Sequence, residues 1–152
     1  MEIKNSHGVV IFQGEEDLRK VNLDDVNLSD AMLEGANLEG ITWMGTNLTG
    51  ANLKGADLYW AILFTSNLMD ANLENANLQG ADLKEVNFTG ANLRNAQLGR
   101  DNLGGATQLQ GAILTGANTQ GANFAGAEYD KQTRFPESFD PNKEGMVFRS
   151  LD

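Results

Sequence analysis

Residues 71–80 read ANLENANLQG, and the same five-residue pattern can be followed along most of the chain. A large apolar residue, most often Leu, recurs every five positions from Leu18 to Leu103. A small residue usually stands two positions before it, Asn or Asp directly before it, and Gly often two positions after it. A period of five fits neither a helix of about 3.6 residues per turn nor the alternation of a flat strand. Because Gly and Asn favour the positive-φ corners of tight turns, each unit is predicted to turn a corner and to point its central apolar residue into a core.

The repeat has two irregularities among the 23 units that we count. One extra residue enters between Gly104 and Gln108, and the centres then resume at Leu109, Leu114, Thr119, Phe124 and Tyr129. We expect this residue to form a bulge at a corner, with Leu103 as a buried centre. Trp43 stands where Leu is expected, which predicts either a locally swollen coil or a tryptophan at the edge of the core.

The composition limits the possible functions. A net charge of −10 with a pI near 4.4 argues against binding to nucleic acid, which needs a basic surface. Cysteine is absent and His7 is the one histidine, so disulfides, thiolate metal sites and two-imidazole mechanisms are excluded. We find no catalytic constellation and expect no cofactor. No apolar run reaches the length of a membrane span, and a cytoplasmic protein is the expectation.

The units AMLEG-ANLEG at 31–40, ANLKG-ADLYW at 51–60 and ANLEN-ANLQG at 71–80 resemble the A(D/N)LXX motif of the pentapeptide repeat family. The C-terminal tail resembles that of cyanobacterial members of the family. The resemblance of the repeats covers residues 16–129. It implies an all-β fold, a right-handed quadrilateral parallel β-helix with four units per coil and about six coils. The centres then form four faces, which begin at Leu18 (face one), Leu23 (face two), Leu28 (face three) and Leu33 (face four). Beyond the extra residue, Thr119 is assigned to face one, Phe124 to face two, Leu109 and Tyr129 to face three, and Leu114 to face four.

Both ends of such a rod expose strand edges that need a cap. Residues 1–15 are predicted to cap the start, with Val10–Gly14 as one more degenerate unit lying over the first coil. Residues 130–152 abandon the repeat and form a non-repeat C-terminal tail rich in Phe. Two interpretations of this tail stay open, a cap folded over the last coil and a dimer surface. The dimer surface is suggested by similarity to the quinolone-resistance branch of the family.

One coil departs from the polar pattern at its outward positions. Apolar residues occupy them where neighbouring coils carry Lys, Asp, Asn and Gly, and the candidate partner surface comprises Met44, Tyr59, Trp60, Ile62, Phe64 and Met69. Contiguous exposed apolar patches on soluble proteins are typical of interaction sites. The alternatives are a surface for self-association, a patch covered by the chain's own ends, and a patch without a role.

Most of the negative charge of the repeats lies before residue 41. The acidic N-terminal end comprises Glu15, Glu16, Asp17, Asp24, Asp25, Asp30, Glu34 and Glu39. These observations favour a non-enzymatic protein–protein interaction module with an unknown protein partner. The resemblance adds two alternatives: a DNA-mimicking regulator of DNA gyrase or topoisomerase, and an adaptor in a cyanobacterial regulatory pathway. A homodimer through the tail or the apolar patch is a further possibility.

Overall fold

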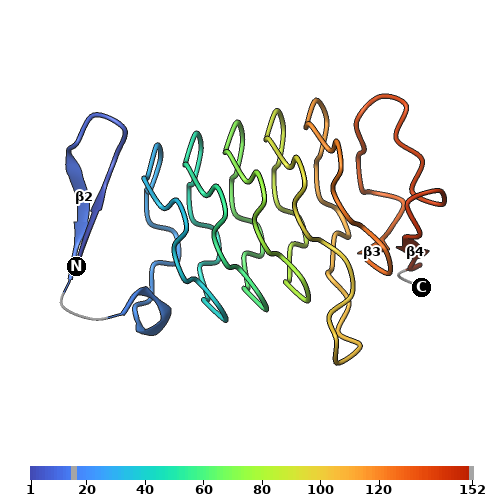
Figure 1. The fold of residues 1–152 in the computed structure, drawn as a ribbon, viewed down its shortest axis with the longest axis horizontal. Helices are drawn as coiled ribbons and strands as arrows, with labels where there is room; N and C mark the ends of the chain where they lie inside the picture. Colours follow the sequence, from blue (N-terminus) through green and yellow to red (C-terminus); the bar gives the residue numbers. More distant parts are fainter. Residues whose placement is uncertain (15–16, 151–152) are drawn as a thin grey trace.

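The chain folds as a rod of stacked coils, in a computed structural model that describes residues 1–14 and 17–150 (Figure 1). Parallel β-bridges join residues 20 apart, such as Asn47 to Asn67 and Asn67 to Asn87, so one coil holds four five-residue units. The fold is therefore a β-helix. Its bridges are single residue pairs because each unit leaves the ladder at the next corner. The longer elements lie at the ends, and they are β1 (Glu2–Lys4), β2 (Val10–Gln13), the 3₁₀ helix η1 (Leu18–Lys20), β3 (Glu128–Tyr129) and β4 (Val147–Phe148).

The corners explain the choice of residues around each centre. The N–H of Ala76 donates to the carbonyl of Leu73 at 3.0 Å, and Asn75 between them has a φ of 60°. This is a β-turn whose third residue is left-handed, a conformation that Gly, Asn and Asp tolerate best. The Asn before each centre also has a local role, since the side-chain oxygen of Asn72 accepts the N–H of Glu74 at 3.1 Å. Leu turns inward, Asn braces the turn, and Gly or Asn forms the corner.

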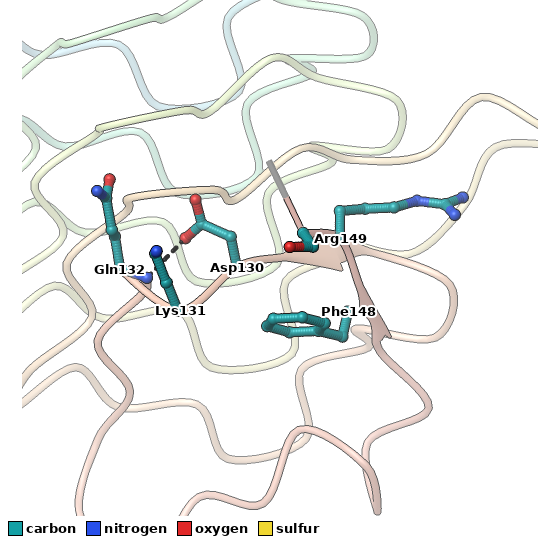
Figure 2. A pocket seen from close by; sticks show the side chains of 6 residues that line it. Asp130, Lys131, Gln132, Phe148 and Arg149 are labelled. Atoms are coloured by element: carbon teal, nitrogen blue, oxygen red, sulfur yellow. Dashed lines mark hydrogen bonds between the residues drawn. The ribbon is translucent and has the colours of Figure 1, made fainter. Parts of the chain in front are cut away.

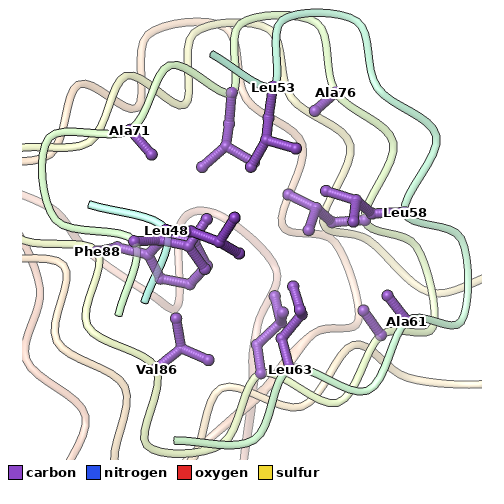
Figure 3. Close-up of a cluster of buried hydrophobic side chains, with 14 of the residues drawn as sticks. Leu48, Leu53, Leu58, Ala61, Leu63, Ala71, Ala76, Val86 and Phe88 are labelled. Atoms are coloured by element: carbon purple, nitrogen blue, oxygen red, sulfur yellow. The ribbon is translucent and has the colours of Figure 1, made fainter. Parts of the chain in front are cut away.

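The core is a column of leucines with alanines at the corners, as Figure 3 shows. Leu48, Leu68 and Phe88 follow one another on face three, and each is at most 1% exposed. Burial of one such side chain contributes about 1.5–3 kcal/mol. Trp43 is fully buried within the same core, so of the two predicted alternatives the place at the edge of the core is wrong. Its indole N–H has no hydrogen-bond partner among the described residues.

The irregularity after Leu98 is larger than the sequence suggests. Asp82 bridges to Gln108, 26 residues further on, so six residues are inserted into this coil and not one. The predicted buried centre Leu103 is 76% exposed, and residues 99–105 form a projecting loop, visible as the yellow-orange protrusion in Figure 1. The prediction of a one-residue bulge with Leu103 in the core is therefore wrong. Six residues are one five-residue unit plus one residue. In the sequence pattern, a whole unit that loops out therefore cannot be told from the insertion of a single residue.

The corrected register moves every later centre by one face. The bridges Asn87 to Ile113, Asn92 to Asn118, Gln97 to Asn123 and Gln108 to Glu128 fix the new assignment. Leu109 and Tyr129 lie on face two, Leu114 on face three, Thr119 on face four and Phe124 on face one.

The start of the chain is a hairpin, not a repeat unit. Strands β1 and β2 pair antiparallel, and Asn5, the residue after β1, joins the hairpin to the rod through an antiparallel bridge to Ala31. The N–H of Met32 donates to the carbonyl of Lys4 at 2.8 Å. The reading of Val10–Gly14 as a degenerate unit is therefore wrong, because a turn at Gly8, with a φ of 77°, folds this segment back on β1. Ile3 of β1 is buried against the core.

The tail folds back over the last coil. Arg134 bridges to Ile113, and β4 then returns to pair parallel with β3. The ring of Phe139 stacks on Phe135 at 4.9 Å and meets Phe124 edge-on at 5.2 Å. Among the residues that the structure describes, no helix is long and apolar enough to cross a membrane.

Candidate functional site

The apolar outward residues lie where the five-residue period places them, before the inserted loop and around the corner between faces one and two. We use the name aromatic band for Tyr59, Trp60, Ile62 and Phe64. Met44 precedes Phe64 by one coil, because Thr42 bridges to Ile62 and the N–H of Gly45 donates to the carbonyl of Phe64. Met44 and Ile62 are each 39% exposed and Trp60 is 47% exposed, while Tyr59 and Phe64 are half-buried. Met69 is half-buried on face three, one corner further round, so the structure groups it less closely with the others.

The backbone of this coil adopts a conformation that its residues disfavour. Trp60 occupies a left-handed corner with a φ of 56°, where the flanking coils carry Gly40 and Gly80. The next corner of the same coil is Thr65, with a φ of 59°. Bulky and β-branched residues are rare in this region, and each such residue costs about 1–3 kcal/mol. The strain is offset at Trp60 by its ring, which stacks on Tyr59 at 5.3 Å with the planes 10° apart.

The inserted loop is fastened to the band. The indole N–H of Trp60 donates a hydrogen bond to the Asp101 carboxylate, 41 residues further along the chain. The other oxygen of Asp101 accepts the N–H of Leu103 at 2.8 Å and that of Gly105 at 2.6 Å. The indole donor first, and then these backbone donors, lower the pKa of Asp101 against the opposing effect of burial. Gly80 lies beneath this contact, and a Cβ there would collide with the indole ring.

The base of the loop is closed by a buried threonine. The hydroxyl of Thr107 donates towards the carbonyl oxygens of Gly99, at 2.9 Å, and Leu78, at 3.2 Å, and accepts the N–H of Gly80 at 3.0 Å. Leu103 lies at the exposed tip of this braced loop. The sequence contains one signal of the loop, the pair Gly104-Gly105. The five-residue pattern instead assigns these glycines to a regular repeat unit and an extra residue.

Cover of the band by the chain's own ends was an open alternative. In the described residues, the N-terminal hairpin bonds to residues 30–32, and the tail bonds to residues 109–114 and 126–129. The contact made to Trp60 comes instead from Asp101 in the inserted loop, and it leaves Trp60 and Ile62 substantially exposed. In the structure the residue that contacts the band therefore comes from the inserted loop and covers the band only in part.

The acidic residues of the first coils are dispersed around the rod. Glu39 lies on face one, Asp24 on face two and Glu34 on face four, while Asp25 and Asp30 form left-handed corners with φ near 58°. Several have local partners. Asp24 accepts the N–H of Met44 at 2.7 Å, and Glu34 accepts the side-chain amide of Asn52 at 3.1 Å.

Asp17 differs from these acids because it begins η1. Its carboxylate accepts hydrogen bonds from the side chain and backbone N–H of Arg19, which lower its pKa to about 2. Glu15 and Glu16, also predicted for the acidic end, lie outside the described residues.

The hollow at the C-terminal end, about 160 Å³ in volume, is bordered by Asp130, Lys131, Gln132, Phe148, Arg149 and Ser150 (Figure 2). Burial would raise the pKa of Asp130, but the N–H groups of Gly111 and Gln132 donate to its carboxylate and lower the pKa. Arg149 pairs with Glu128 at 2.9 Å. Asp130 therefore stabilises the turns around it, and Arg149 links the end of β4 to β3. Among the described residues, no group of three His, Cys, Asp or Glu side chains is placed to hold a metal ion.

Solved structures of three repeat proteins are similar to this chain. A pentapeptide repeat protein from the cyanobacterium Cyanothece 51142 is 38% identical, over 62% of this chain and 64% of its own, with a TM-score of 0.39. HetL, a pentapeptide repeat protein involved in heterocyst differentiation regulation from Nostoc sp. strain PCC 7120, is 28% identical over 85% of this chain and 58% of its own, with a TM-score of 0.43. One from the Arabidopsis thaliana thylakoid lumen is 32% identical over 72% of this chain and 66% of its own, with a TM-score of 0.41. This chain spans less than two thirds of each.

The family model described as pentapeptide repeats matches the chain in eight copies, at residues 15–40, 27–63, 66–101 and 106–128. The match spans well over half of the chain, and the unmatched residues 102–105 coincide with the projecting loop. No curated protein sequence matches the chain. With its five-residue period, its bridges 20 residues apart and this match, the chain belongs to the pentapeptide repeat family.

Proposed function

We propose that this chain is a non-enzymatic protein-interaction module, a right-handed quadrilateral rod of about six coils that docks a protein partner through the aromatic band. One observation carries the proposal. Of the nine large hydrophobic side chains that are exposed among the described residues, Met44, Trp60, Ile62 and Leu103 belong to the corner between faces one and two. The family is generally non-catalytic, which supports a role in binding.

The energetics favour a binding surface over an incidental patch. Exposed apolar area costs solubility, and aromatic and Met side chains dominate the centres of protein interfaces. The strain at Trp60 and Thr65 supports the same interpretation. Gly would adopt this left-handed corner without steric strain, so the tryptophan is present at some expense to the rod's own stability.

The charge distribution does not favour the DNA-mimicking alternative. Residues 15–127 carry 14 acids and six bases, a net charge of −8, of which −6 lies before residue 41. Duplex DNA carries a uniform charge of about one per 1.7 Å. The other alternative, an adaptor role in a cyanobacterial regulatory pathway, is compatible with docking through the aromatic band, because an adaptor also binds a protein partner.

The proposal is tested by site-specific photo-cross-linking. A benzoylphenylalanine at position 64, incubated with extract of the source organism, is expected to give a discrete cross-linked protein, and Trp60→Gly is expected to abolish it. Trp60→Gly restores the residue of the flanking corners but removes the indole donor to Asp101, so a thermal melt is recorded to show that the rod stays folded. The control is the same cross-linker at Thr115, at the equivalent position on face three in a later coil. Identical cross-links from positions 64 and 115, or cross-links indifferent to Trp60→Gly, would disprove the proposal. A cross-linked species of twice the chain's mass would identify self-association instead.

A further inference from the structure

The projecting loop extends the aromatic band into a larger surface. The Asp101 carboxylate is bonded on one side to the Trp60 indole and on the other to the N–H of Leu103. Leu103 is therefore held at a fixed place beside Trp60 by a single shared acceptor. The tip is further tightened by the bond from the N–H of Asp101 to the carbonyl of Gly105 at 2.8 Å. A preorganised apolar tip loses little entropy when it binds, which makes Leu103 suited to anchor a partner.

The rim of this surface is acidic. Glu39 precedes Tyr59 by one coil, since the N–H of Gly40 donates to the carbonyl of Tyr59, and its side chain is exposed. Asp24 and Asp25 precede Met44 and Gly45 by one coil.

The basic residues near the band balance only part of this charge. Lys84 is paired with Asp82 at 3.2 Å, and Arg19 with Asp17 at 2.5 Å. Lys20 and Arg19 border the same hollow as Asp24, and Arg100 stands beside Asp101 in the projecting loop. The surroundings of the surface keep a net charge of −2, from six acids (Asp17, Asp24, Asp25, Glu39, Asp82, Asp101) and four bases (Arg19, Lys20, Lys84, Arg100). Burial, together with the charges of Asp101 and Glu39, raises the pKa of Tyr59, as expected where the local potential is negative.

We infer that the surface formed by Leu103, Trp60, Ile62 and Met44 binds a basic segment of a partner protein. The apolar side chains of that segment pack against Leu103 and the exposed edge of the band. Its Lys or Arg side chains lie against Glu39, Asp24 and Asp25. The inference rests on the proposed function and adds the chemistry of the partner to it. Charge complementarity selects this occupant. A second copy of the chain would bring a net charge of −10 to an acidic rim, and an acidic segment would be repelled in the same way.

The two parts of the surface are expected to act differently on binding. Buried anchors set most of the affinity, so Leu103→Ser should weaken binding by about tenfold or more. Rim charges act mainly on the association rate and on its salt dependence, so Glu39→Lys should weaken binding by about threefold to tenfold at low salt and less at high salt. Glu34→Lys makes the same charge change one unit earlier, on face four, and should leave binding close to that of the parent.

The test uses a phage-displayed library of random dodecapeptides. Phage are selected on the folded parent protein and counter-selected on the double variant Trp60→Gly, Leu103→Ser. Enriched peptides are synthesised, and their dissociation constants are measured by fluorescence anisotropy against the parent, Leu103→Ser, Glu39→Lys and Glu34→Lys. We expect peptides with net positive charge and at least one large apolar residue, whose binding follows the order just given.

The outcomes separate this inference from the docking proposal. Enriched peptides that are neutral or acidic, or that bind Glu39→Lys and the parent equally, would overturn the basic-segment inference and leave docking through the band intact. Peptides that bind the double variant as tightly as the parent, or no enrichment at all, would overturn both. Sedimentation that shows a parent dimer dispersed by Leu103→Ser would identify a second copy as the occupant and also overturn the inference.

Discussion

Leu68 and Leu103 provide the sharpest test of the register, because the five-residue pattern treats them alike and the structure does not. Leu68 is fully buried on face three between Leu48 and Phe88, and Leu103 is 76% exposed at a loop tip. Leu→Ala at a buried site costs about 2–5 kcal/mol, depending on how far the surroundings can collapse. Collapse is limited at Leu68, because its N–H donates to the carbonyl of Asn87 at 2.8 Å and fixes the spacing of the coils. We therefore expect Leu68→Ala to lose about 3–5 kcal/mol of unfolding free energy.

Leu103→Ala should change the unfolding free energy by no more than about 0.5 kcal/mol, as is typical of exposed side chains. Both variants are measured by urea denaturation with far-UV circular dichroism, and tryptophan fluorescence checks that the two transitions coincide. Leu68→Lys, which places an unpaired charge in the dry core, is expected to prevent folding. If Leu103→Ala destabilised the protein as much as Leu68→Ala does, Leu103 would be a core centre and the projecting loop would not exist.

Three further predictions concern the band and the ends. Because the pKa of Asp101 is lowered, its hydrogen bond with Trp60 should persist at pH 3.8, the ordinary carboxylate pKa, and be lost only as the pH falls further. The fluorescence of Trp60, obtained by subtracting the spectrum of a Trp60→Phe variant, should report the loss of this bond. A fluorescence transition above pH 3.8 would contradict the prediction. Thr65→Asn should raise the unfolding free energy by about 0.5–1 kcal/mol in urea, since Asn tolerates the left-handed corner; a lower value would argue against strain there. Truncation after Tyr129 uncovers Phe124, so we expect a lower melting temperature and larger particles by light scattering; an unchanged melt would show that the tail is not a cap.

Most of the rod could be predicted from the sequence because its rules are local. Leu in the centre and Asn before it, with Gly, Asn or Asp at the corner, fix the direction of every side chain within one unit, so the outward placement of Trp60 and Ile62 followed from the period alone. The failures arose where local and long-range information disagree. Asn102, Leu103 and Gly105 satisfy the five-residue pattern, and the pairing of Asp82 with Gln108 shows that this unit has left the coil.

The N-terminal hairpin was missed for a related reason. Val10–Gln13 has the apolar content of a repeat unit, but its partner is β1 and not the next coil. The fastening of the loop could not be predicted either. It joins Trp60 and Asp101 across 41 residues, and no periodic rule relates a tryptophan at one corner to an aspartate in an insertion.

The loop and the strained corner are best explained together. Trp60 alone would be a costly substitution at a position that Gly fills in the flanking coils. The loop alone would be an exposed insertion with an apolar tip. Joined through Asp101, each limits the cost of the other, because the carboxylate satisfies the indole N–H and the indole helps to hold the carboxylate that braces the loop. The rod would be more regular without either, so the pair is explained by what it presents, a fixed apolar edge with an acidic rim.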